Sequence, residues 1–157
     1  MNYSDINSRP GSGKKYRVIT GLPRSRTFWL SQFFIDSIHE PKDRLSVPKD
    51  HIIIDHSFID KFIDLTDESL IVSVLRDPSD SFKSFKRAKE NGELPIGPIP
   101  PLSWFQTRYD IIESLPGLKV YFDLLDERLD SIASFLHLRY DLDRHHKLLK
   151  ERLVRSY

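Results

Sequence analysis

The chain has 157 residues, with 24 Lys and Arg against 23 Asp and Glu, a formal net charge of +1 and no cysteine. This length suits one compact domain, because domains of about 100–150 residues are the commonest size. The near-zero net charge argues against a general polyanion binder, so we expect no bulk binding of nucleic acid. Without cysteine, disulfides, thiolate catalysis and cysteine-based zinc sites are excluded.

The distribution of apolar residues limits the location of the protein. No segment approaches the roughly 20 consecutive apolar residues of a membrane span, and the N-terminal segment lacks the apolar region of a signal peptide. We therefore expect a cytoplasmic protein with no membrane association. Residues 1–15 are polar, rich in Ser, Gly and Asn and without apolar periodicity. We interpret them as a flexible leader before a single domain over residues 16–157.

Short apolar runs alternate with helical patterns along the rest of the chain. We expect strands at residues 17–20, 51–55, 70–75 and 118–122. Apolar spacing predicts helices from 27 to about 39, 78 to about 89, 102–115, 129–136 and 142–157, with a shorter amphipathic piece over 58–65. The proline-rich segment 93–101 is expected to be a loop. This alternation predicts a three-layer α/β/α sandwich around a central parallel sheet.

Residues 16–30, YRVITGLPRSRTFWL, combine a predicted strand, a Gly-Pro loop and the start of a predicted helix. Unpaired N–H groups and the dipole at the start of a helix attract phosphate or sulfate. Gly21 lets the backbone turn closely around such an anion. Charged and hydroxyl donors would surround it, from Arg24, Ser25, Arg26 and Thr27. The segment therefore predicts binding of a nucleotide-like ligand.

Two further polar clusters also follow predicted strands. DHS at residues 55–57 follows the second strand, and RDPSDSFKS at residues 76–84 follows the third. Ligands of open α/β sheets bind at the carboxyl ends of the strands, so we expect all three clusters to meet. Arg76 and Ser84 would both reach one phosphate if the chain folds back across it. Asp77 is interpreted as a helix N-cap and not as a catalytic residue.

At these residues the sequence resembles the sulfotransferases that use 3′-phosphoadenosine 5′-phosphosulfate (PAPS). TGLPRSRTFW looks like their 5′-phosphosulfate loop, and LRDPSDSFKSF is similar to their 3′-phosphate motif. In that motif an arginine and a serine eight positions later hold the 3′-phosphate, and Arg76 and Ser84 keep this spacing. LKVYFDLLDERLDSIASFLHL also resembles a later family segment. The resemblance covers residues 16–138 and implies a P-loop-type α/β fold.

The resemblance also implies roles for individual residues. Arg24 stands where the family has a Lys or Arg at the bridging oxygen of the transferring sulfonate, and Ser25, Arg26 and Thr27 would donate to the 5′-phosphate. His56 occupies the place of the family's catalytic histidine and would take the proton from an acceptor hydroxyl or amine. Arg24 and His56 are thus the expected catalytic residues. No metal is expected, because Arg24 would stabilise the charge of the leaving group.

Three departures from the family pattern leave alternatives open. Arg26 replaces a residue that is usually glycine, Ile54 replaces a common lysine, and a Gly-rich, lysine-containing C-terminal motif has no counterpart. One alternative is a non-catalytic module that binds or sequesters PAPS or 3′-phosphoadenosine 5′-phosphate (PAP). Another is a nucleotide-dependent phosphotransferase, although the loop after the first strand lacks a Walker lysine. The sequence identifies neither the acceptor nor the oligomeric state.

Overall fold

The computed structural model describes residues 14–34, 37–43, 52–138 and 143. In chain order the elements are β1 (Tyr16–Gly21), α1 (Thr27–Phe33), β2 (Ser37–His39), β3 (Ile52–Ile54), α2 (Phe58–Lys61), η3 (Ile63–Glu68), β4 (Ser69–Leu75), α3 (Pro78–Glu90), α4 (Leu102–Ser114), β5 (Leu118–Tyr121), η4 (Phe122–Glu127) and α5 (Leu129–Phe135). The strands form one parallel sheet in the order β2-β3-β1-β4-β5. The carboxyl ends of these five strands therefore share one edge of the sheet.

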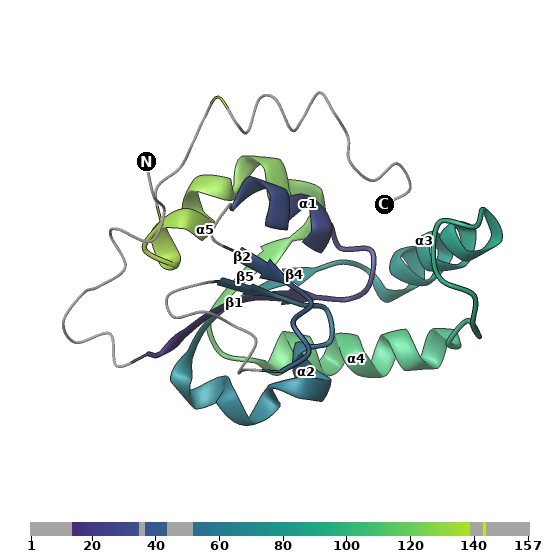
Figure 1. Ribbon diagram of the computed structural model, residues 1–157, viewed down its shortest axis with the longest axis horizontal. Helices are drawn as coiled ribbons and strands as arrows, with labels where there is room; N and C mark the ends of the chain where they lie inside the picture. Colours follow the sequence, from purple (N-terminus) through teal and green to yellow (C-terminus); the bar gives the residue numbers. More distant parts are fainter. Residues whose placement is uncertain (1–13, 35–36, 44–51, 139–142, 144–157) are drawn as a thin grey trace.

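Helices cover both faces of this sheet (Figure 1). Helices α1 and α5 lie on one face, and α2 and α4 lie on the other. Successive strand residues point to opposite faces, so Ile19 packs with Trp29 of α1, whereas its neighbour Val18 packs with Phe58 of α2. The predicted three-layer α/β/α sandwich around a central parallel sheet is confirmed.

The inner strands are apolar on both sides, as a sheet covered by helices requires. All three residues of β3 are fully buried, and β1 pairs with β4 along its whole length, from Tyr16 opposite Ser69 to Gly21 opposite Val74. The chain enters β5 through Gly117, whose φ is +107°. A Cβ at this position would lie 2.1 Å from the Ile71 carbonyl oxygen, so only glycine fits there.

One predicted element is wrong: the helix expected from residue 27 to about 39 ends at Phe33. Phe34 already has extended dihedral angles, and Ser37–His39 forms the edge strand β2 beside β3. Phe34 and Ile38 are four positions apart, which fits a helical face equally well. Pairing of β2 with β3, a contact between distant parts of the chain, decides the conformation, and local spacing does not report it.

The other predicted strands and helices agree with the structure to within one or two residues, except at the two ends of the chain. The amphipathic piece expected over 58–65 is divided into α2 (Phe58–Lys61) and η3 (Ile63–Glu68). The flexible leader expected over 1–15 lies outside the described residues apart from Lys14 and Lys15, whose Nζ and N–H donate to the carbonyl oxygens of Asp67 and Glu68. The helix expected over 142–157 also lies outside them, except for Asp143.

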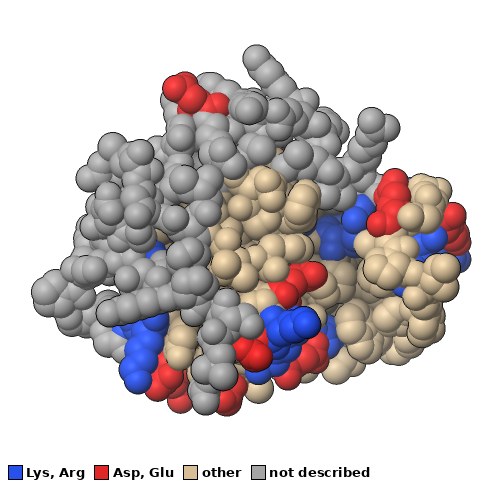
Figure 2. Space-filling view, viewed as in Figure 1, with Lys and Arg blue, Asp and Glu red and all other residues tan. Residues whose placement is uncertain are grey.

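Charge and hydropathy of the described surface are mixed. In Figure 2, Lys and Arg lie next to Asp and Glu along the lower rim of the face shown, and uncharged residues occupy its centre. Among the helices of the described part of the chain, none has the length and apolar character needed to cross a membrane.

Candidate active site at the carboxyl edge of the sheet

The loop after β1 is shaped by a close approach between neighbouring strands. A Cβ on Gly21 would lie 2.9 Å from the Val74 carbonyl oxygen and 3.2 Å from the Ser25 Cβ, so a larger residue would displace the loop. Two loop residues, Arg24 and Arg26, have positive φ values of 68° and 66°. Non-glycine residues rarely adopt this conformation, and it recurs at ligand-binding sites.

Arg76, which follows β4, and helix α3 hold the loop in this shape. The Arg76 guanidinium donates from Nη1 to the Arg24 carbonyl oxygen, and the Ser81 hydroxyl donates to the Pro23 carbonyl oxygen. Arg24 in turn donates from Nε to the Ser84 hydroxyl at 3.3 Å. The structure thus brings Arg24, Arg76 and Ser84 together, as the eight-residue spacing between Arg76 and Ser84 predicts.

Two buried donors of this cluster have no hydrogen-bond partner among the described residues. They are the hydroxyl of Ser25, which is fully buried, and Nε of Arg76, whose side chain also stacks over the Phe122 ring at 4.1 Å. A buried donor without a partner costs free energy, so such groups are rare unless a ligand or water satisfies them. These donors fit an anion placed between the loop and α3.

The charge of this cluster is positive. Burial lowers the pKa of Arg24 and of Arg76, and the proximity of the Arg24 guanidinium lowers the pKa of Arg76 further, against the opposing effect of the Asp80 carboxylate. Arginine remains protonated at neutral pH even after such a shift. Two guanidinium groups held together in a partly buried site favour an anionic ligand.

The Arg26 side chain makes different contacts from those of Arg24 and Arg76. Its guanidinium forms an ion pair with Asp126 at 3.0 Å and lies 4.0 Å from the centre of the Trp29 ring. Arg26 is the N-cap residue of α1 in the left-handed conformation, which explains why glycine is common at this place in the family it resembles. Because α1 has only seven residues, its dipole is a weak argument for an anion site. The argument rests mainly on the side chains around the loop.

Two neighbouring strand ends bring His56 next to Glu40. Glu40 follows β2 and His56 follows β3 by two residues, and the Glu40 Oε1 lies 2.5 Å from the His56 Nδ1. Hydrogen bonding to His56 lowers the pKa of Glu40. His39, at the end of β2, lies 3.5 Å from the Thr27 hydroxyl, and burial lowers its pKa. A histidine and a carboxylate in contact can act as a general base.

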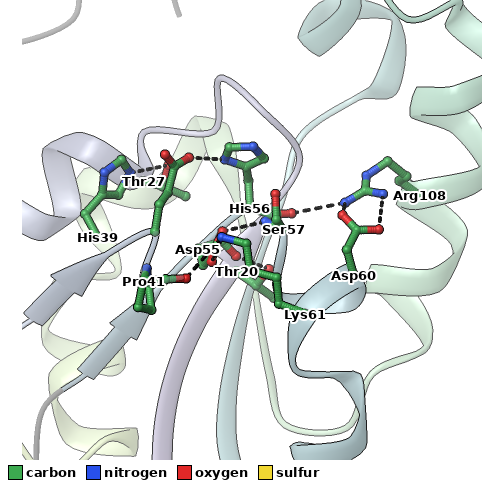
Figure 3. A network of polar contacts seen from close by, with 11 residues as sticks. Thr20, Thr27, His39, Pro41, Asp55, His56, Ser57, Asp60, Lys61 and Arg108 are labelled. Carbon is green, nitrogen blue, oxygen red and sulfur yellow. Dashed lines mark hydrogen bonds and ion pairs between the residues drawn. The ribbon is translucent and has the colours of Figure 1, made fainter. Parts of the chain in front are cut away.

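A frame of polar contacts holds these strand ends (Figure 3). The buried carboxylate of Asp55 accepts from the Ser57 N–H at 2.7 Å and from the Lys61 ammonium at 2.9 Å. Arg108 of α4 pairs with Asp60 and donates to the His56 carbonyl oxygen at 3.4 Å. His56 therefore lies in a turn that is fixed from two sides.

One cavity joins the two groups of residues. It has a volume of about 290 Å³, and its lining includes Arg24 of the loop between β1 and α1 (residues 22–26, the anion loop), Thr27 of α1, and Glu40 and His56 after the strand ends. Phe28, Phe85 and Leu94 add apolar surface. A second cavity of about 400 Å³ lies beside Arg76, with the aromatic rings of Tyr109, Tyr121 and Phe122 in its lining.

Sequence reasoning identified part of this site. Asp77 accepts from the N–H groups of Ser79 and Asp80, so the prediction of an N-cap is confirmed. His39 and Glu40 were not predicted, because His39 ends a strand that was expected to be part of a helix, and Glu40 directly follows that strand. Their position at the carboxyl end of a strand is a signal that becomes visible once β2 is recognised.

Comparisons with known proteins add one observation. No family model matches the sequence, and curated proteins give no match either. Among solved structures, the chain is similar to a mouse sulfotransferase, SULT7A1, in a crystal structure complexed with PAP, with a TM-score of 0.54 and 13% sequence identity. The match covers 92% of this chain and 66% of the sulfotransferase chain, just under two thirds. At this identity the likeness shows a shared fold.

Proposed function

We propose that the protein is a sulfotransferase-like enzyme that binds PAPS and transfers its sulfonate group to a hydroxyl or amine acceptor. The observation that carries the proposal is the cavity that Arg24 and His56 share, with Arg76 and Ser84 in contact with Arg24. One arginine of the anion-binding cluster and a candidate base thus line the same cavity, as a transfer from an anionic donor to a neutral acceptor requires.

The proposed nucleotide site uses the cluster between the loop and α3. In this assignment the 5′-phosphate binds at the loop after Gly21, where Ser25 and Thr27 donate to it, while Arg76 and Ser84 hold the 3′-phosphate. The unsatisfied Ser25 hydroxyl and Arg76 Nε support this assignment. The aromatic residues of the second cavity, beside Arg76, provide surfaces for a nucleobase, which favours a nucleotide over an inorganic anion.

In the proposed reaction the acceptor oxygen or nitrogen attacks sulfur, and a new O–S or N–S bond forms. The bond between sulfur and the bridging oxygen of the 5′-phosphate breaks, and PAP leaves with the electron pair. His56 takes the proton of the acceptor, and the Arg24 guanidinium stabilises the negative charge that develops on the leaving oxygen. Arg24 supplies this charge without a metal ion.

Calorimetric titration with PAP, ADP and ATP, each with and without magnesium, tests the nucleotide site. We expect PAP to bind without magnesium, and ADP and ATP to bind much more weakly. Binding of ATP only in the presence of magnesium would support a phosphotransferase instead. Absence of PAP binding would contradict the proposal.

A histidine substitution separates an enzyme from a binding module. In His56→Ala, sulfonate transfer should fall about 10²-fold to 10⁴-fold, the usual contribution of a general base, while PAP affinity stays unchanged. His137→Asn is the matched control, because His137 lies at the end of α5 and Asn tolerates its φ of 57°. PAP binding without turnover in the unmodified chain, across a panel of alcohols and amines, would favour the non-catalytic module.

A further inference from the structure

The contact between Glu40 and His56 indicates that the two residues have different roles in the candidate site. We propose that Glu40 is a positioning residue that holds His56 in the tautomer and orientation of a general base. The proposal deepens the proposed function and rests on the role of His56 in sulfonate transfer. Its structural basis is the 2.5 Å distance between the Glu40 Oε1 and the His56 Nδ1.

The chemistry of the imidazole ring follows from this contact. A neutral histidine carries a proton on one ring nitrogen and a lone pair on the other, and an ionised carboxylate can only accept a hydrogen bond. Glu40 therefore places the proton on Nδ1 and leaves the lone pair on Nε2. When Nε2 takes a proton from the acceptor, the resulting imidazolium lies against a carboxylate that stabilises its charge and keeps its own.

The ionisation of Glu40 is consistent with this role. Its side chain is partly exposed, and the hydrogen bond to His56 lowers the pKa of the carboxyl group, which outweighs the opposing effect of burial. Glu40 is thus an anion at neutral pH.

The backbone of Glu40 is held in an uncommon conformation. Its φ is 53°, which non-glycine residues rarely adopt. The Glu40 N–H donates to the Ile54 carbonyl oxygen at 2.9 Å, and the Lys61 ammonium donates to the carbonyl oxygen of the next residue, Pro41, at 3.2 Å. Contacts from β3 and α2 therefore stabilise the turn that directs the Glu40 side chain to His56. Strained backbone conformations persist only where the surrounding structure fixes them, and they cluster at functional sites.

His56 is fixed from its own side as well. The preceding residue, Asp55, accepts from the Ser57 N–H and from Lys61, and Arg108 donates to the His56 carbonyl oxygen. Lys61 contacts both turns, since it donates to Pro41 and to Asp55 (Figure 3). Lys61 thereby fixes the two turns relative to each other, and with them the positions of Glu40 and His56.

The same place in the fold offers a metal-binding alternative. Glu40, Asp55 and His56 each bring one ligand atom within 4.8 Å of the others. Both oxygens of Asp55 already accept hydrogen bonds, one from Lys61 and one from the Ser57 N–H. A divalent cation bound to Asp55 would lie next to the Lys61 ammonium and be repelled by its charge, so the geometry favours the Glu40–His56 dyad.

The tautomer of His56 provides a test that does not depend on turnover. Long-range ¹H–¹⁵N spectra of the full-length protein, with the His56 signals assigned from the His56→Gln variant, should show the Nδ1–H tautomer. In Glu40→Gln the population should shift towards Nε2–H, and Glu40→Asp should keep the Nδ1–H form in part. The Nε2–H tautomer in the unmodified protein, or the same spectrum in Glu40→Gln, would overturn the proposal.

Kinetics give the second readout. In Glu40→Gln, kcat for sulfonate transfer should fall about 100-fold, at the lower end of what a general base contributes, while the dissociation constant for PAP stays unchanged. Partial rescue by Glu40→Asp supports positioning by a carboxylate. Glu90→Gln, an exposed glutamate at the end of α3, is the matched control.

The tautomer spectra and the kinetics distinguish a failure of the proposed function from a failure of the positioning role of Glu40. If the protein binds PAP but shows no turnover, the proposed enzyme fails and with it the catalytic role of Glu40, whereas the tautomer spectra still decide whether the dyad exists. If Glu40→Gln loses turnover while the His56 spectra stay unchanged, the positioning role of Glu40 is wrong and the proposed function still stands. Zinc binding that disappears in both Glu40→Gln and Asp55→Asn would assign the cluster to a metal and overturn the dyad.

Discussion

The two sides of the candidate site are held in place by different kinds of interaction. On the proposed nucleotide side, Arg76, which directly follows β4, and Ser81 of α3 donate to backbone carbonyl oxygens of the anion loop. On the acceptor side, carboxylates dominate, since Asp55 accepts from the Lys61 ammonium and Glu40 accepts from the His56 ring. Carbonyl oxygens do not titrate, whereas carboxylates do. The shape of the anion loop should therefore be less sensitive to acid than the strand ends that carry His56.

The strongest test of this contrast is the removal of Arg76. Arg76→Ala deletes a buried guanidinium that contacts the loop and belongs to the proposed 3′-phosphate site. A charge-assisted hydrogen bond contributes about 1.5–3 kcal/mol, so PAP affinity should fall about 10-fold to 100-fold in calorimetry, while the His56 tautomer is unchanged.

Lys83→Ala is the matched control, since it removes one exposed positive charge from α3, the helix that begins two residues after Arg76. We expect it to leave PAP affinity unchanged. An equal loss of affinity in both variants would mean that net charge determines binding and that the position of Arg76 does not.

A buried carboxylate offers the corresponding test on the acceptor side. Asp55→Asn leaves the Lys61 ammonium without its partner, and breaking a buried ion pair from one side costs about 3–5 kcal/mol. Because Lys61 is one-third exposed, we expect a smaller loss, about 2 kcal/mol, in urea unfolding at pH 7. PAP affinity should stay the same below the unfolding transition. A loss of PAP affinity as large as that in Arg76→Ala would show that the two sides are not independent.

Substitutions of Arg26 separate backbone strain from side-chain contacts in the loop. Arg26→Ala and Arg26→Gly both remove the ion pair with Asp126 and the stacking on Trp29, but only glycine relieves the positive φ. Chemical denaturation should therefore find Arg26→Ala less stable than Arg26→Gly by about 1 kcal/mol. Equal stability would show that the backbone relaxes in the alanine variant.

The smallest expected effect concerns pH. Hydrogen bonding from Arg108 lowers the pKa of Asp60, so the unfolded chain binds a proton more readily than the folded protein does. The pair stabilises the fold above the unfolded pKa of about 3.9, and this contribution is lost as the pH falls through the folded pKa.

Urea unfolding from pH 7 to pH 3 measures this effect. Asp60→Asn should be slightly less stable than the unmodified protein at pH 7, and the difference should shrink as the pH falls below about 3.9. Asp64→Asn, which removes an exposed carboxylate from the neighbouring η3, is the control for the loss of one negative charge. A difference that does not change with pH would contradict an electrostatic contribution.

The sequence was sufficient for much of the nucleotide side and for only part of the acceptor side. Arg24, Arg76 and Ser84 lie in two continuous motifs, each directly after an apolar strand, so local patterns locate them. His56 was found in the same way, from its place after β3. The direction of the Arg26 side chain was not predictable, because Asp126 lies 100 positions further along the chain.

The fold class was predictable for a similar physical reason. Strands such as β3 and β4 are buried on both faces and leave a clear apolar run in the sequence. The edge strand β2 has three half-buried residues, and its conformation depends on pairing with β3. Glu40 belongs to this segment, so its proximity to His56 becomes apparent only when the strands are assembled.

The position of β2 at the border of the sheet gives the two sides of the site unequal local stability. Three residues paired on one side only can open without unfolding of the central strands, and local opening costs less free energy than global unfolding. Amide hydrogens of β2 should therefore exchange faster than those of β1. On warming, Glu40 should separate from His56 at a temperature at which the proposed PAP site is still intact, so the proposed sulfonate transfer should be lost before PAP binding.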